Sequence, residues 1–186
     1  VDNVLSGLHP GLNLLAARPS MGKTAMALMN KRAKDRLFEA ASEANYQNEK
    51  DFLAVLNDEE GAAPNGEDVK YTGTNRETVL MRLALQHDWP TSVAGLLRKV
   101  GISRDTPCDP AGSDQACKDF LNAQDKDGGT ALHGAVKHAA GGKQEFSTTV
   151  LLVERGADRE VKNNEGKTAA EGYQDDRDMN QLVAYL

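Results

Sequence analysis

Apolar residues recur at the spacing of helix faces through the middle and the end of the chain. The clearest pair of helices lies between residues 125 and 158. Its first helix follows Thr130, a residue type that caps helix N-termini, and its second ends at Gly156, which can adopt a left-handed conformation. The apolar positions of the two helices are Leu132, Ala135, Val136, Val150, Leu151 and Val153. This pattern predicts two helices joined by a loop.

The same order of turn, helix pair and glycine stop repeats along the chain. Gly128 is equivalent to Gly166, and Thr130 is equivalent to Thr168. Two weaker copies lie upstream, and the second of them stops at Gly101. Their marker positions are Leu37, Ala40, Ala41, Phe52, Leu53 and Leu56, then Thr78, Leu80, Ala84, Val93, Leu96 and Leu97. The pattern predicts four units, at about 34–72, 73–124, 125–162 and 163–186.

The third unit resembles the ankyrin repeat. Asp125, Gly128, Thr130, Leu132, His133 and Ala135 match that family's D-x-x-G-x-T-P-L-H-x-A, with Ala131 at the usual Pro, and Gly156, Ala157 and Asp158 match its closing G-A-D. The resemblance implies an all-α fold, an ankyrin-repeat solenoid of four helix-turn-helix units with an N-terminal helical cap. In this context we expect His133 to join one turn to the next by a hydrogen bond rather than to act as a ligand or a base.

The spacing of the units departs from the family's period of about 33 residues. Thr78 and Thr130 lie 52 residues apart, and Thr130 and Thr168 lie 38 apart. The second unit therefore carries an insert at 102–120, and the third carries a shorter one between its helices. Inserts in solenoids fall in loops, often on one face, where they can be used for recognition. The longer insert and the concave surface formed by the turns and first helices are therefore the two candidate recognition surfaces.

A nucleotide-binding pattern stands near the start of the chain. Residues 17–24 read A-x-x-x-x-G-K-T, and the surrounding 25 residues resemble the Walker A region of DnaB-type replicative helicases. In a working loop, Gly22, Lys23 and Thr24 would bind ATP or GTP with magnesium. Hydrolysis would also need an acidic residue at the end of a second strand. The nearest candidates, in 52–59 and 149–154, already fit the helices of the repeats.

A structural role for the same segment is the other interpretation. Thr24 would cap a helix reaching about Ala44, with Met26, Met29, Ala33 and Leu37 along one side. Residues 1–33 would then form an N-terminal segment docked on the first repeat, followed by the ankyrin-repeat domain at 34–186.

Composition narrows the function classes. The net charge of −6 argues against a general nucleic-acid surface, which would be basic. No apolar run is long enough to cross a bilayer and no secretory signal precedes the repeats, so we expect no membrane partner and a cytoplasmic protein, or one delivered into a host cell. One disulfide between Cys108 and Cys117 is possible, but two cysteines do not make a secreted disulfide framework. A zinc site would need two more ligands at suitable spacing, so we expect free thiols in a reducing compartment.

These observations predict a non-catalytic protein–protein interaction module. A bacterial effector or adaptor would fit this class. We expect a monomer that binds another protein, with no cofactor, no metal and no catalytic residues. The acidic balance favours a partner with a basic patch. The alternative is an ATP- or GTP-binding protein that uses residues 17–24. Candidate protein contacts are Asn75, Arg76, His87, Trp89, Lys126, Asp127, Asn164 and Glu165.

Overall fold

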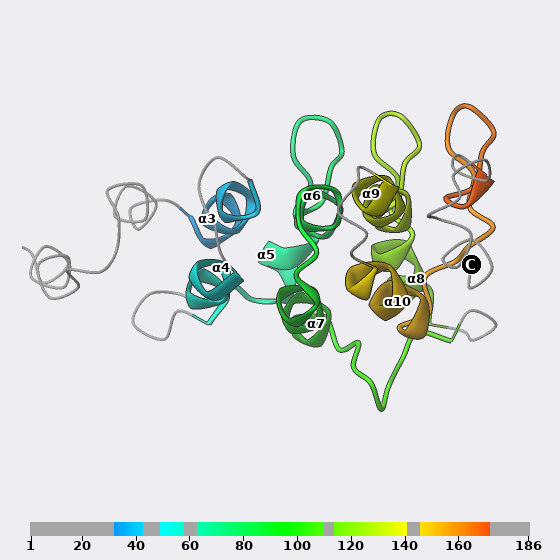
Figure 1. Ribbon diagram of the computed structural model, residues 1–186. Helices are drawn as coiled ribbons and strands as arrows, with labels where there is room; N and C mark the ends of the chain where they lie inside the picture. Colours follow the sequence, from blue (N-terminus) through cyan, green and yellow to red (C-terminus); the bar gives the residue numbers. More distant parts are fainter. Residues whose placement is uncertain (1–31, 43–48, 58–62, 110–113, 141–145, 172–186) are drawn as a thin grey trace, which may run out of the picture.

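The computed structural model describes residues 32–42, 49–57, 63–109, 114–140 and 146–171 (Figure 1). Regular structure in these segments is helical, apart from an isolated antiparallel bridge between Thr72 and Thr78. The predicted all-α class is therefore confirmed. The described helices are α3 (Ala33–Ala40), α4 (Glu49–Leu56), α5 (Gly66–Lys70), α6 (Val79–Gln86), α7 (Pro90–Lys99), α8 (Gln115–Leu121), α9 (Ala131–His138) and α10 (Ser147–Glu154).

The helices stand in two rows. Figure 1 shows α3, α6 and α9 along one row and α4, α7 and α10 along the other. Within the rows α6 packs against α9, and α7 packs against both α4 and α10; between the rows α3 contacts α4 and α9 contacts α10. The two segments that could have imitated a second nucleotide-binding strand are thus the helices α4 and α10. No helix of the described residues combines the length and the apolar character that a membrane span requires.

Local signals place the helix ends where the sequence predicts them. Thr78 Oγ1 accepts the N–H of Met81 at 3.2 Å, and Thr130 Oγ1 accepts that of His133 at 3.5 Å. At the other end of the pairs, Gly101 and Gly156 have φ of 87° and 93°. Such positive φ values cost little for glycine, so both residues stop their helices as expected.

The core lies between the two rows. The predicted positions Leu80, Ala84, Val93, Leu96 and Leu97 are all fully buried. Each large aliphatic side chain contributes about 1.5–3 kcal/mol when it leaves water. The same cluster continues through Phe52 of α4, Leu132 of α9 and Leu152 of α10, so one apolar core joins successive helix pairs.

The start of the described chain differs from the expected cap helix. Arg32 is extended, with φ of −60° and ψ of 149°, and α3 begins at Ala33. One continuous helix from Thr24 to Ala44 is therefore wrong, because the backbone leaves the helical region at Arg32 and α3 ends at Ala40. The nucleotide-loop candidates Gly22, Lys23 and Thr24 lie outside the described residues. So do residues 1–31 of the segment 1–33 that was expected to dock on the first repeat.

The insert at 102–120 is more than a surface loop. Its last part forms α8, in which Phe120 is 6% and Leu121 is 1% exposed. These two side chains belong to the continuous core. The prediction of a loop was wrong here because a seven-residue helix with two core positions is too short for helical periodicity to stand out.

The second helix of the third unit also turns a different face inward. Thr148, Thr149 and Leu152 are buried, whereas the apolar residues singled out from the sequence are only partly buried there. A helix with β-branched residues on all sides shows little difference between apolar and polar positions around its axis. Which face is buried then depends on the helices that pack against it.

The two cysteines are not free thiols. Cys108 and Cys117 form a disulfide, with their Cα atoms 5.8 Å apart. Cys117 in α8 lies next to Cys108 in the segment that follows α7. The spacing of the two residues in the sequence did not reveal this proximity.

Candidate functional site

Three turns share one pattern of backbone hydrogen bonds. Two of them precede the helices α6 and α9 of the first row, and the third stands at the equivalent position of the fourth unit. They are Gly73–Glu77, Asp125–Gly129 and Asn163–Lys167. In each, the N–H of the first residue donates to the carbonyl of the fifth, at 2.9, 3.0 and 2.9 Å. The N–H of the fourth residue donates back to the first carbonyl, at 3.0, 3.2 and 2.9 Å. The turns therefore repeat as structural units.

The fourth residue of each turn has a left-handed backbone. Its φ is 59° at Arg76, 76° at Gly128 and 77° at Gly166. The role predicted for Gly128, a positive φ in the tight turn, is confirmed. Arg76 adopts the same conformation with a side chain, although L-residues with a Cβ disfavour it.

Short polar side chains hold the second and third turns in shape. Asp125 Oδ1 accepts the N–H groups of Asp127 and Gly129, at 2.9 and 2.8 Å. Asn163 Oδ1 accepts those of Glu165 and Lys167, at 2.9 and 3.1 Å. The side-chain oxygen accepts the hydrogen bonds that two amides of the turn would otherwise donate to water. These bonds hold the exposed tips in a defined conformation.

Backbone hydrogen bonds also join the tips to one another. The Lys126 N–H donates to the Asn75 carbonyl at 2.9 Å, and the Asn164 N–H donates to the Asp127 carbonyl at 3.0 Å. The Asn164 side-chain amide adds a bond to the Lys126 carbonyl at 3.0 Å. Figure 1 shows the three loops side by side along one edge. We call the six residues of these tips the tip row: Asn75, Arg76, Lys126, Asp127, Asn164 and Glu165.

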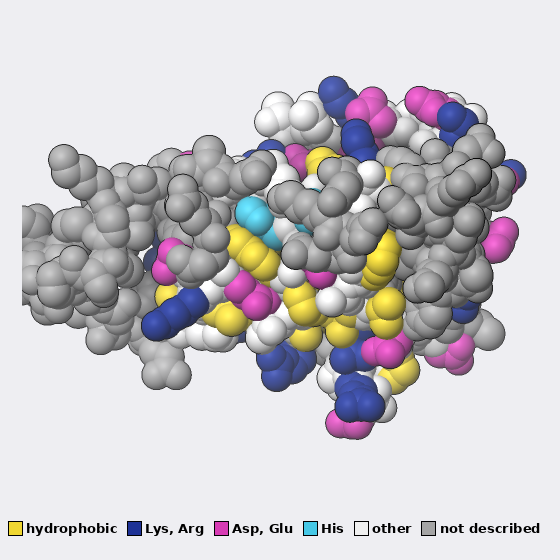
Figure 2. All heavy atoms as spheres, viewed as in Figure 1, with side chains coloured by type: hydrophobic (Ala, Val, Ile, Leu, Met, Phe, Trp, Pro, Cys, Tyr) yellow, Lys and Arg dark blue, Asp and Glu magenta, His cyan; other side chains and the backbone are white. Residues whose placement is uncertain are grey.

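The tip row unites six of the eight predicted contact residues. All six are exposed. Their charges are mixed, with Arg76 and Lys126 positive and Asp127 and Glu165 negative, and Figure 2 shows both signs along this edge. The row itself is therefore not a uniformly acidic surface, and the overall negative charge does not describe it.

The remaining two predicted contacts, His87 and Trp89, lie apart from the tips, in the segment between α6 and α7. Their rings stack with centroids 3.7 Å apart and planes inclined by 9°. The Trp89 ring also lies 6.4 Å from that of Phe52. Both residues are partly buried, so Trp89 contributes to packing between the first two units as well as to the surface.

His133 joins two units, as expected. Its Nδ1 accepts the Thr130 N–H at 3.3 Å, which leaves the proton on Nε2. Nε2 lies 3.1 Å from the Lys167 carbonyl, to which it donates. The imidazole is thus occupied on both nitrogens and joins the start of α9 in the third unit to the turn of the fourth unit.

The sequence did not reveal a pair of carboxylates that cap helices of the following unit. Glu49 Oε1 accepts the Ser92 N–H at 2.7 Å in the first turn of α7. Asp88 accepts the N–H groups of Ser147, at 3.2 Å, and Thr148 at the start of α10. The first backbone N–H groups of a helix have no acceptor within that helix, and both carboxylates accept hydrogen bonds from such groups.

A capping pair stands at the described end of the fourth unit. The Thr168 N–H donates to Glu171 Oε2 at 2.8 Å, and the Glu171 N–H donates to Thr168 Oγ1 at 3.4 Å. The pKa of the Glu171 carboxyl is lowered from its ordinary value of 4.5. The largest cause is the hydrogen bond from the Thr168 backbone, and the second is the hydrogen bond from the Thr168 side chain. The predicted equivalence of Thr130 and Thr168 extends to their capping geometry.

The described residues hold no group of three or more His, Cys, Asp or Glu side chains arranged to bind a metal ion. What they offer is a rigid, exposed and chemically mixed edge. Such an edge can form hydrogen bonds and ion pairs with a complementary surface.

Comparison with known proteins identifies a similar fold. No family model matches the chain, and no curated protein matches it. A chain in the crystal structure of the yeast ribosomal protein Rps3 in complex with its chaperone Yar1 superposes with a TM-score of 0.59 at 20% sequence identity. The alignment covers 82% of this chain and 89% of that chain, so the likeness extends over most of the fold.

Proposed function

We propose that this chain is an ankyrin-repeat solenoid that binds another protein and catalyses no reaction. The carrying observation is the tip row, in which backbone hydrogen bonds join the tips of successive units. A surface whose backbone is already ordered loses less conformational entropy on binding than a mobile loop does. The likeness to a chain from a complex of a ribosomal protein with its chaperone accords with a binding role.

The partner we propose presents charges of both signs. Arg76 and Lys126 lie toward one end of the row and Glu165 toward the other, with Asp127 between them. Pairing of these charges with opposite charges on the partner fixes the orientation of the partner and disfavours binding in the wrong register. It contributes more to this specificity than to affinity. The interaction is therefore expected to weaken as salt concentration rises, because exposed ion pairs are screened.

Site-specific photo-crosslinking tests this function. A photoreactive amino acid replaces Lys126 or Glu165 in the tip row, or the exposed Arg98 on α7 as a control. Covalent adducts with a single protein from the two tip positions, and none from Arg98, are the expected result. Adducts that form only from Arg98, or equally from all three positions, would contradict the tip row as the binding surface.

The alternative function is ATP or GTP binding by Gly22, Lys23 and Thr24. It is supported by the sequence of residues 17–24. The helices α4 and α10 occupy the segments that could have supplied a second, acid-ending strand. We therefore favour the protein-binding function, and a nucleotide titration separates the two.

A further inference from the structure

The dipeptide Asn65-Gly66 stands at the start of α5, between the helices of the first and second units. Asparagine is followed by glycine nowhere else in the sequence. Because glycine has no side chain, its backbone nitrogen reaches the side-chain carbonyl carbon of a preceding asparagine with the least hindrance. Asparagine is also one of the chemically labile residue types. The sequence therefore places the chain's most reactive position for deamidation at Asn65.

Packing against α7 requires the glycine of this pair. A Cβ on Gly66 would lie 2.9 Å from the carbonyl oxygen of Lys99, the last residue of α7. Gly66 is partly buried at this contact, whereas Asn65 is exposed. A reactive dipeptide is thus kept in contact with water because the fold leaves no room for a larger residue after Asn65.

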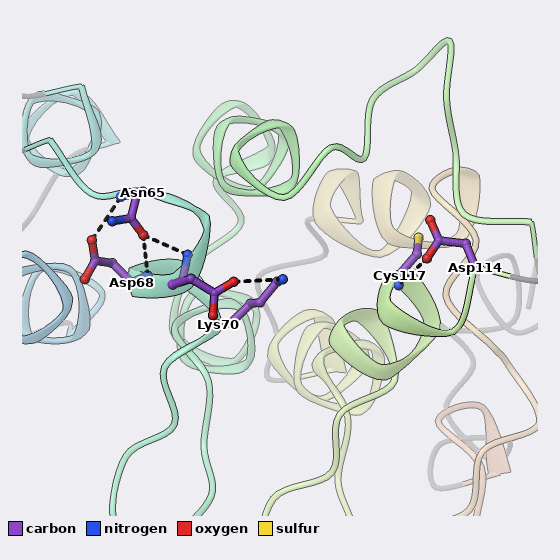
Figure 3. Close-up of polar contacts among 6 residues, drawn as sticks. Asn65, Asp68, Lys70, Asp114 and Cys117 are labelled. Carbon is purple, nitrogen blue, oxygen red and sulfur yellow. Dashed lines mark hydrogen bonds and ion pairs between the residues drawn. The ribbon is translucent and has the colours of Figure 1, made fainter.

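Asn65 is also the cap of α5. Its Oδ1 accepts the N–H groups of Glu67 and Asp68, at 2.8 and 3.0 Å (Figure 3). Its own N–H donates to Asp68 Oδ2 at 3.0 Å, which completes a capping box. Its carbonyl accepts the Val69 N–H at 3.1 Å. Hydrogen bonds therefore hold both the backbone and the side chain of Asn65.

Deamidation at this pair passes through a cyclic imide. The Gly66 nitrogen loses its proton to solvent and attacks Asn65 Cγ, and the side-chain nitrogen takes up a proton and leaves as ammonia. Water then opens the ring. Cleavage of the bond from the nitrogen to Cγ gives aspartate, and cleavage of the bond to the backbone carbonyl carbon gives isoaspartate, whose main chain runs through Cγ. Overall, one water is consumed and one ammonia is released.

The folded conformation of Asn65 opposes ring closure. Its ψ is −179°, so its backbone is extended. Closure requires rotation about the Cα–C bond until the Gly66 nitrogen eclipses Cβ. This rotation turns the Asn65 carbonyl away from the Val69 N–H, and the attack on Cγ removes Oδ1 from its two donors. The cap of α5 must therefore open before the ring can form.

We propose that Asn65 is a deamidation site that the cap of α5 holds back, and that its isoaspartate product loosens α5 from its neighbours. The helix α5 contacts α3, α6 and α7, and it buries Val69 completely. Isoaspartate lengthens the main chain by one carbon, which displaces the capping oxygen from the amides that donate to it. This inference goes beyond the proposed function, since it requires no partner and concerns a segment outside the tip row.

The test incubates the full chain at neutral pH, both folded and in urea. Peptide mapping by mass spectrometry follows the conversion of Asn65, with the exposed Asn75 as an internal reference. We expect conversion of Asn65 to be slower by about tenfold in the folded chain, because the cap must open first. Equal rates in the folded and unfolded chains would overturn the proposal, and so would conversion of Asn75 in urea as fast as that of Asn65.

Two variants of α5 separate the cap from its surroundings. Asp68→Ala removes the acceptor of the Asn65 N–H and should speed the reaction of the folded chain by about fivefold. Glu67→Ala is the matched control, because it removes the carboxylate that pairs with Lys70 and keeps the backbone N–H that donates to Asn65. It should react at the native rate, and equal rates in the two variants would contradict the proposal. The comparison of folded and unfolded native chain decides the matter if Asp68→Ala fails to fold.

The isoaspartate product tests the effect on α5. This form is separated by ion-exchange chromatography, and its amide hydrogen exchange is compared with that of the unmodified chain. Exchange at Val69 should be faster by about tenfold, and exchange at Gly134 in α9 should be unchanged. Unchanged exchange at Val69 would refute the loosening of α5.

Discussion

The Asp88 carboxylate accepts the backbone N–H of Thr148, 60 residues further along the chain. It also accepts the N–H of Ser147, so one side chain from the second unit caps the helix α10 of the third. Glu49 does the same for Ser92 in α7, across 43 residues. The repeated use of a carboxylate from the preceding unit couples the units by hydrogen bonds as well as by apolar contact.

Replacement of Asp88 by alanine is expected to lower the free energy of unfolding by about 1–2 kcal/mol, because two helix-start amides lose their acceptor. Urea unfolding followed by circular dichroism measures the change. Asp105→Ala, in the exposed turn that follows α7, is the matched control and should stay within about 0.5 kcal/mol of the native chain. Equal stability of the two variants would contradict the capping role.

Gly156→Ala should be far more destabilising than Gly101→Ala. Both glycines have a positive φ, so each substitution carries the left-handed cost of about 1–2 kcal/mol. At Gly156 the new Cβ would also collide with the Cys108 carbonyl, whereas nothing lies within 4 Å of it at Gly101.

The difference between these two variants isolates the collision from the backbone strain. We expect a gap of at least about 1–3 kcal/mol, the usual cost of forcing extra atoms into a packed site. Chemical denaturation of both proteins measures the gap. Similar stabilities would mean that the segment carrying Cys108 can move away from α10 at little cost.

Arg76→Gly is expected to stabilise the chain. The residue occupies the left-handed position that Gly128 and Gly166 occupy in the other two turns. Relief of the strain, reduced by the extra backbone freedom of glycine in the unfolded chain, leaves a gain of about 0.5–1 kcal/mol. Arg76→Ala keeps the Cβ and removes the charge, so it should show no such gain in thermal unfolding.

The capping pair of Thr168 and Glu171 predicts a pH dependence. Because hydrogen bonds from Thr168 hold the pKa of the folded Glu171 carboxyl below 4.5, its contribution is fully present above pH 4.5. That contribution is lost as the pH falls through the lowered pKa of the folded state. NMR titration of the Glu171 carboxyl should give a midpoint below 4.5.

Thr168→Ala tests the origin of this shift. The variant keeps the backbone N–H, which is the largest cause, and removes the hydroxyl. The midpoint is expected to rise part of the way toward 4.5. An unchanged midpoint would show that the hydroxyl takes no part in lowering the pKa.

Magnesium with ATP or GTP should not raise the melting temperature of the full chain. A ligand present at a hundred times its dissociation constant would add about 2.7 kcal/mol to the stability of the folded state. Differential scanning fluorimetry of the native chain and of Lys23→Ala makes the comparison. A rise in the native chain that Lys23→Ala abolishes would favour the nucleotide-binding alternative instead.

The tip row illustrates how far the sequence could lead. Lys126, Asp127, Asn164 and Glu165 were predicted as turn residues because the glycines at 128 and 166 mark the turns locally. Nothing in the sequence showed that Asn164 donates to the carbonyls of two residues in the preceding turn. That bond depends on how far one unit is displaced and rotated relative to the next.

The sequence by itself determined the helix pairs, their threonine caps and their glycine stops. These features depend on residues within about four positions of one another, where backbone sterics and capping hydrogen bonds act. Only the tertiary structure decided the disulfide, the core role of α8 and the cap that Asp88 gives to α10. Each of these joins groups that are distant in the chain, and the packing of the two rows of helices brings them together.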